Sequence, residues 1–344
     1  MATVWNPRRP LISFMTLFVL LFCAAELLTR VLVPVSLSRQ ISVPHMFRDS
    51  EEVGYRLHRN ITTNVRAWDG RRNIFQATYR TDNHGRRFVE IPNFSGRDRH
   101  FVVLGGSTVF GMGLEDRDTL TAFLGTETTR TMPYNYAGDG YGPQNALALI
   151  KLGVLQNEVP QEEGVTVFFF QALHQAGGHI QTLLGRFELL LDGWGETLPV
   201  YKIARGEKPV AVGRLRQYDP LKFYFFRFLQ NFHVLNLLYP KVFPISPEEL
   251  QLTAEFMVAM RDEVRIAKPK SRFVVALHPF SDAELAASMT NIMQKNGLEV
   301  LNLSTLVDKS RLQEFVAFNR YFPHPNGKLN KLLATTLVET LEIP

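Results

Sequence analysis

The chain has 344 residues, of which 45% are hydrophobic and 21% charged, so it is long enough for one large globular domain or two smaller ones. The formal net charge is +5, but no block of Lys and Arg interleaved with aromatic residues occurs, which argues against a nucleic-acid partner. With a single cysteine, Cys23, the chain can form neither an internal disulfide nor a cysteine-based metal site.

An apolar run near the N-terminus is the first predicted element. The stretch Leu11 to Thr29 carries one charge, Glu26, and as a helix it would span roughly 28 Å, close to the core of a bilayer. We predict a short cytoplasmic segment at 1–10 and a transmembrane signal anchor at 11–33. A cleaved signal peptide and a helix buried on every face are the alternatives. The flanking arginines give only a weak indication of orientation.

The region at 34–97 is predicted to form a small β-rich extension. Its clearest signal is an extended run followed by the sequence Asp82-Asn83-His84-Gly85. These are turn-forming residues, and the glycine permits a positive φ.

From about residue 98 onward, apolar strand patterns alternate with helical patterns. Strands are expected within 101–106, 164–173, 272–279 and 298–304, and a strand end followed by a loop within 133–142. Helices are expected within 119–129, 145–155, 282–297 and 326–341. This alternation predicts a doubly wound α/β domain at 98–344. An insertion at about 180–245 contains an unusually aromatic stretch. We interpret that stretch as a helix packed on the core or, alternatively, as a hydrophobic flap near the site or the membrane.

Polar loops follow several of these strands, and ligands of open α/β sheets bind at the carboxyl ends of the strands. One loop holds Gly105-Gly106-Ser107, and another precedes the last helix and holds His324. Ser107 matches neither the Gly-x-Ser-x-Gly elbow nor a P-loop, so on its own it is either a helix N-cap or a nucleophile. A serine nucleophile needs a base, and histidine is the usual one.

Three blocks together resemble the SGNH/GDSL hydrolase superfamily: "VVLGGSTVFG", "YNYAGDGYGPQNAL" and "FPHPNGKLNKLLA". The resemblance covers roughly 98–340 apart from the insertion, and it implies a three-layer α/β/α domain with a central, mainly parallel sheet. It also implies that Ser107 is the nucleophile, His324 the general base and Gly140 an oxyanion-hole residue. The preceding extension resembles that of membrane-anchored bacterial members, some of them linked to cell-surface polysaccharides.

Two blocks depart from the family pattern. The third should offer Gly-x-Asn-Asp, but the chain has "FFFQALHQAGGH", which leaves Gln171 or His174 as candidate donors; for His174, simple loop polarity is the alternative. Tyr321 and Phe322 occupy the positions expected for the aspartate that orients the catalytic histidine. A Ser-His dyad could still operate if a backbone carbonyl or Asp308 orients the ring; otherwise hydrolysis has been lost.

The leading hypothesis is a membrane-anchored serine esterase or O-acyltransferase that uses a Ser-His dyad and neither a metal nor another cofactor. Its substrate would be an acylated extracytoplasmic glycan or a small ester. The alternative is an inactive SGNH-fold protein that binds glycan, or acts as a scaffold among the proteins of a cell-envelope polysaccharide assembly. Either role implies a single-pass protein of the bacterial inner membrane with its main domain in the periplasm.

Overall fold

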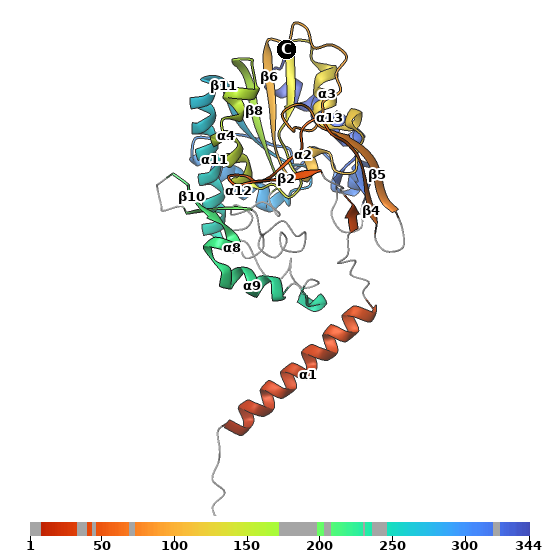
Figure 1. Cartoon of the computed structure of the whole chain (residues 1–344), viewed down its shortest axis with the longest axis vertical. Helices are drawn as coiled ribbons and strands as arrows, with labels where there is room; N and C mark the ends of the chain where they lie inside the picture. Colours follow the sequence, from red (N-terminus) through yellow and green to blue (C-terminus); the bar gives the residue numbers. More distant parts are fainter. Residues whose placement is uncertain are drawn as a thin grey trace, which may run out of the picture.

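A long N-terminal helix, α1 (Arg8–Leu32), projects from a folded body built around a central sheet (Figure 1). The computed structural model describes residues 8–32, 40–42, 46–68, 73–171, 198–202, 208–229, 231–235, 246–318 and 324–344. Within these residues, one helical segment, Ser13–Leu32, is long and apolar enough to cross a membrane; its mean hydropathy is 2.0 and only 6% of it is buried. A signal sequence has the same properties, so the helix is consistent with either interpretation.

The central sheet is parallel and contains five strands in the order β12-β11-β8-β6-β7. Its strands are β6 (Arg99–Gly105), β7 (Thr131–Asn135), β8 (Glu163–Phe170), β11 (Lys270–Leu277) and β12 (Glu299–Asn302). The chain runs from β6 to β7 on one side and then returns to β8 on the other. In such sheets the crevice for ligands lies at the carboxyl ends of the strands where this reversal occurs. Here that point is the end of β6 and β8.

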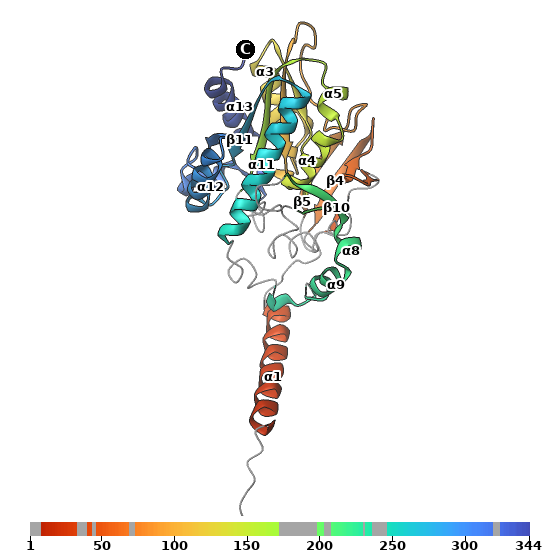
Figure 2. The same cartoon turned by 90° about the vertical axis from the view of Figure 1, so that its left-hand side faces the viewer.

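Helices cover both faces of the sheet, which gives the predicted three-layer α/β/α class (Figure 2). One face packs on α4 (Pro143–Lys151) and α11 (Pro247–Ala267). The other packs on α3 (Leu120–Glu127) and α13 (Gly327–Leu341). Other described helices of the domain are α5 (Val154–Glu158) and α12 (Ala283–Lys295). Successive residues of a strand point to opposite faces, so the buried run 101–104 contributes to both cores. The fold class expected from the sequence is confirmed.

The extension before the domain is made of short antiparallel strands. They are β1 (Gln40–Ser42), β2 (Phe47–Ser50), β3 (Gly54–Leu57), β4 (Thr62–Trp68) and β5 (Asn73–Arg80), with β2 paired to β3 and β1 and β5 paired to β4. The predicted turn after β5 is confirmed: Gly85 has φ +78° and its amide donates to the carbonyl of Asp82 over 3.0 Å. The Asp82 carboxylate accepts hydrogen bonds from the backbone amides of His84 and Arg86.

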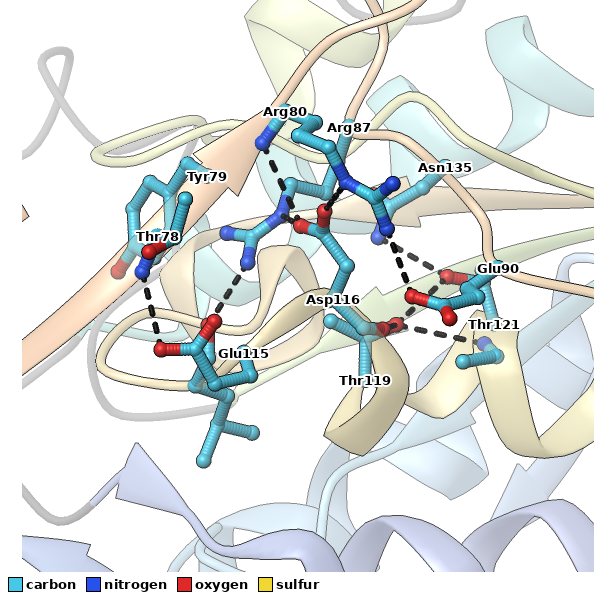
Figure 3. A network of polar contacts seen from close by, with 12 residues as sticks. Thr78, Tyr79, Arg80, Arg87, Glu90, Glu115, Asp116, Thr119, Thr121 and Asn135 are labelled. Atoms are coloured by element: carbon cyan, nitrogen blue, oxygen red, sulfur yellow. Dashed lines mark hydrogen bonds and ion pairs between the residues drawn. The ribbon is translucent and has the colours of Figure 1, made fainter. Parts of the chain in front are cut away.

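A buried ion cluster joins the extension to the α/β domain (Figure 3). Arg87 is only 1% exposed; it donates from Nε to Asp116 Oδ1 over 2.8 Å and from Nη2 to the carbonyl of Leu114 over 2.7 Å. Its guanidinium lies over the ring of Tyr79, 3.7 Å from the centroid. Arg80, at the end of β5, donates from Nε to Asp116 Oδ2 over 2.6 Å. Asp116 therefore holds two cations from the extension, and both its oxygens are used.

The described part of the insertion is a hairpin followed by two helices. They are β9 (Pro199–Lys202), β10 (Val210–Arg214), α8 (Leu215–Tyr218) and α9 (Pro220–Leu229). Phe223 of α9 is fully buried, whereas Leu221, Tyr224, Phe225 and Phe228 are each more than half exposed. The aromatic stretch is thus a helix packed on the body through one side, with an apolar side left open.

Candidate active site

Strand β6 ends on Gly105 because the position tolerates no side chain. Gly105 has φ +152°, and a Cβ there would lie 2.7 Å from Val109 Cγ2 and 3.1 Å from the carbonyl oxygen of Phe169. The carbonyl of Gly105 accepts the amide of Gly138 over 3.1 Å. The glycine therefore lets the end of β6 pass close to β8 and to the loop after β7.

Ser107 is the first residue of α2 (Ser107–Phe110), a single helical turn at the carboxyl end of β6. The N-cap is Gly106, and no side chain caps this helix. The N-cap interpretation of Ser107 is therefore wrong: the residue lies one position too far along, and its hydroxyl makes a different contact. The turn is held by Asn135, which is fully buried and donates from Nδ2 to the carbonyl of Val109 over 3.2 Å.

The hydroxyl of Ser107 meets the imidazole of His324, with 2.9 Å between Oγ and Nε2. The two residues are 217 positions apart in the chain. His324 is only 6% exposed and belongs to β14 (His324–Pro325), which pairs with β13 (Val316–Phe318). The separation is within hydrogen-bond reach of a nucleophile and its base.

Asn326 fixes the backbone that carries His324. It is the N-cap of α13: its Oδ1 accepts the amide of Leu329 over 3.2 Å, and its Nδ2 donates to the carbonyl of Glu314 over 2.8 Å. Its own amide donates to the carbonyl of Phe315 over 2.9 Å. Asn326 thus ties down the backbone on the C-terminal side of His324.

The candidate oxyanion-hole residues are Gly140, Gln171 and His174, and the first two follow different strands of the sheet. Gly140 lies in the loop after β7 with φ +69°, but the contact of that loop with the end of β6 is made by Gly138. Gln171 follows β8 directly and is buried. His174 lies outside the described residues. The backbone of Gly140 and the side chain of Gln171 remain candidates for donors to the substrate.

What orients His324 is not the acid that the sequence offered. The carboxylate of Asp308 is exposed and accepts from the amide and hydroxyl of Ser310, over 2.8 and 2.7 Å, so it caps a 3₁₀ segment, Lys309–Phe315. These two hydrogen bonds lower the pKa of Asp308. Tyr321 and Phe322, which replace the expected aspartate, lie outside the described residues.

A second buried histidine, which the sequence analysis missed, lies near this pair. His278 follows β11 and is 0% exposed; its amide donates to the carbonyl of Phe170 over 2.9 Å. Val274 and Ala276 of β11 pack in the core that contains α13, so the alternation of the strand turns His278 toward the same face. Burial, together with the charge that His324 would carry, lowers the pKa of His278 to about 3. Its imidazole is therefore neutral at neutral pH.

The tautomer of His278 follows from its hydrogen bonds. The amide of Phe280 donates to Nδ1 over 3.1 Å, so Nδ1 must be the acceptor and Nε2 must carry the proton. Nε2 has no hydrogen-bond partner among the described residues. A buried, neutral N–H donor without an acceptor among the described residues is costly in a folded protein.

The described residues contain no group of three or more His, Cys, Asp or Glu side chains able to hold a metal ion. The polar groups that do gather here are a serine, its imidazole partner, a buried amide side chain and a neutral N–H donor. Such a set can carry out acyl transfer, in which a hydroxyl is activated by a base and a developing oxyanion is stabilised by donors.

Comparisons with known proteins gave the following results. No protein-family model matches the chain, and no curated protein matches it in sequence. Among solved structures, it is similar to a member of the lipolytic G-D-S-L family from Veillonella parvula DSM 2008 (11% identity, TM-score 0.40), covering 71% of this chain and 98% of that one. A G-D-S-L protein from Desulfitobacterium hafniense DCB-2 gives 12% identity and a TM-score of 0.35, with coverages of 70% and 98%. An acetyl xylan esterase from Butyrivibrio proteoclasticus gives 9% and 0.37, with coverages of 76% and 67%.

Proposed function

We propose that this protein is a membrane-anchored serine esterase or O-acyltransferase that acts on acyl groups of an extracytoplasmic glycan. The observation that carries the proposal is the 2.9 Å contact between Ser107 Oγ and His324 Nε2 at the reversal point of the sheet. The sequence blocks that resemble SGNH hydrolases support the reaction class. The glycan and the periplasmic location rest on the resemblance of the extension alone.

The first half of the reaction forms an acyl-enzyme. Ser107 Oγ attacks the carbonyl carbon of the ester while its proton passes to His324 Nε2, and the carbonyl oxygen becomes an oxyanion. The same proton then passes to the departing alkoxide, which leaves an acyl group on Ser107. In the second half, His324 takes a proton from water or from a sugar hydroxyl as that oxygen attacks the acyl carbon. The bond between the acyl carbon and Ser107 Oγ then breaks, and His324 returns the proton to Oγ. Water gives hydrolysis, and a sugar hydroxyl gives acyl transfer.

A fluorophosphonate probe tests whether Ser107 is a nucleophile. We expect covalent labelling at Ser107, located by peptide mass spectrometry, because the histidine contact activates that hydroxyl. Labelling should be lost in Ser107→Ala. Absence of labelling in a folded wild-type protein would contradict the enzyme hypothesis and favour the alternative, a glycan-binding or scaffold protein. That alternative is supported by the departures in the third block and before His324.

We further propose that the Nε2–H group of His278 donates a hydrogen bond to the substrate oxygen as it becomes an oxyanion. Replacing it in His278→Leu removes that donor, and loss of one oxyanion donor typically lowers kcat by about 10²–10³-fold. We expect kcat for a soluble acetyl ester to fall by such a factor with KM little changed, because the contact forms mainly in the transition state.

His100 provides the matched control for this variant. It is also a buried histidine with a depressed pKa, about 4 because of desolvation, but it lies at the opposite end of β6 and contacts Gln161 and Ser271. We expect His100→Leu to lower stability and leave kcat unchanged. Equal kcat values for wild type and folded His278→Leu would overturn the donor role.

A further inference from the structure

One side of the second half of α1 contacts the folded body. Among residues 13–32, the side chains that are not fully exposed are Phe22, Ala25, Glu26 and Thr29. Their spacing of three, one and three residues puts them on one side of a helix. The other sides are open and apolar, as in a span that contacts lipid.

Polar contacts hold that face to residues 231–235 of the insertion. The Glu26 carboxylate accepts the backbone amide of His233 on Oε1 over 2.9 Å and that of Val234 on Oε2 over 3.0 Å. Arg30 donates from Nε to Glu26 Oε1 and from Nη2 to the carbonyl of Asn231, each over 2.8 Å. The one charge of the apolar run is thus satisfied by two amides and one cation.

A row of aromatic rings continues from this contact along α9. The ring of Phe22 meets that of Phe232 edge-on with centroids 5.3 Å apart, and Phe232 meets Phe228 at 5.2 Å. Phe228 leads to the open apolar side of α9, where Leu221 is 84% exposed. Both views place α9 at the end of the body from which α1 projects (Figures 1 and 2).

From these contacts we propose that α1 is retained in the mature protein and that α9, together with residues 231–235, lies in the lipid headgroup region beside it, docked through Glu26. The occupant of the open side of α9 is therefore the lipid surface, because that side is continuous with an apolar span. This inference rests on the membrane anchoring in the proposed function, but not on its catalysis. A helix removed as a signal peptide would leave the amides of His233 and Val234 unpaired.

The depth of Glu26 agrees with this placement. Glu26 lies six residues before Leu32, the end of α1, which corresponds to about 9 Å along the helix axis. Interfacial helices bury their apolar faces about 5–10 Å into the boundary between headgroups and acyl chains. At that depth an unpaired carboxylate is costly, so its partners stabilise both the charge and the docked segment.

Depth-dependent fluorescence quenching tests the proposal on the full-length protein in phosphatidylethanolamine/phosphatidylglycerol vesicles. In a Cys23→Ser background, a fluorophore is attached at Phe225→Cys on α9, or at Gln294→Cys, an exposed control position on α12. Brominated lipids should quench the label at 225 several-fold more than that at 294. Equal quenching at the two positions would overturn the lipid contact. A label at 225 that is shielded from the lipids because the protein forms a dimer would overturn it as well.

Glu26→Leu separates docking from anchoring. The substitution makes the span more apolar, so the protein should remain in the vesicles after alkaline carbonate extraction while quenching at 225 falls toward the value at 294. Unchanged quenching in this variant would overturn the role of Glu26. Intact-mass measurement of wild-type protein must find residues 1–32, since a cleaved N-terminus contradicts the whole inference. Hydrolysis of a soluble ester by the same samples reports separately on the proposed catalysis.

Discussion

Ser107→Ala is expected to lower the turnover of a soluble acetyl ester at least about 10³-fold, because it removes the atom that forms the acyl-enzyme. The fold should be unaffected. The hydroxyl caps no helix, since the N-cap of α2 is Gly106, and the turn is held instead by Asn135. Initial rates give the loss of activity, and thermal unfolding followed by circular dichroism gives the melting temperature.

Ser304→Ala is the matched control for this measurement. Ser304 is a buried serine that lies close after a strand of the sheet, as the half-buried Ser107 does, but it follows the edge strand β12 and its hydroxyl donates to Asn302 over 2.7 Å. We expect this variant to keep wild-type turnover. Turnover by pure, folded Ser107→Ala equal to that of wild type would exclude the serine mechanism.

Asp116→Ala is expected to reduce the free energy of unfolding by about 3–5 kcal/mol, the usual cost of leaving a buried charge without its partner. Hydration cannot replace the lost partner of Arg87, because its side chain is fully buried between the extension and the domain (Figure 3). Arg80 loses the same carboxylate but is more exposed and keeps Glu90 over 2.6 Å. Urea unfolding at equilibrium measures the change.

The comparison is Asp98→Ala, which also removes an aspartate paired with an arginine. Asp98 and Arg130 are both more than half exposed, so solvent screens their attraction. Exposed pairs of this kind contribute about 0–1 kcal/mol. Similar losses in Asp98→Ala and Asp116→Ala would show that the buried cluster does not join the extension to the domain as proposed.

Most strands and helices could be predicted from the sequence because their burial leaves a local pattern. The continuous apolar run at 101–104 and the amphipathic run at 282–297 are examples. Helix α11 was missed, although Ser246 and Glu249 form a capping box at its start. The strand order could not be predicted, since periodicity shows which face is buried but not which strand is adjacent.

Ser107 and His324 could be selected from the sequence as candidate site residues. The distance between them could not be predicted from it. Ser107 follows an apolar run, and His324 directly precedes a predicted helix. Both positions indicate the same edge of a sheet. His278 has a similar signal, a polar residue directly after the run "VVAL", yet its neutral state depends on burial by distant elements. Asp308 has the right chemistry for an orienting acid, but its carboxylate is hydrogen-bonded to Ser310. The type of residue alone therefore does not predict its partner.

The long separation between Ser107 and His324 has a consequence for how activity arises during synthesis. Every residue up to β13 can emerge from the ribosome while the serine still lacks its base, because His324 lies just before the last helix. The contact between Ser107 and His324 therefore forms only when the C-terminal segment has docked against α2 and α3. Acyl-transfer chemistry would then be withheld from the nascent chain, and ester turnover would serve as a direct measure of completed folding.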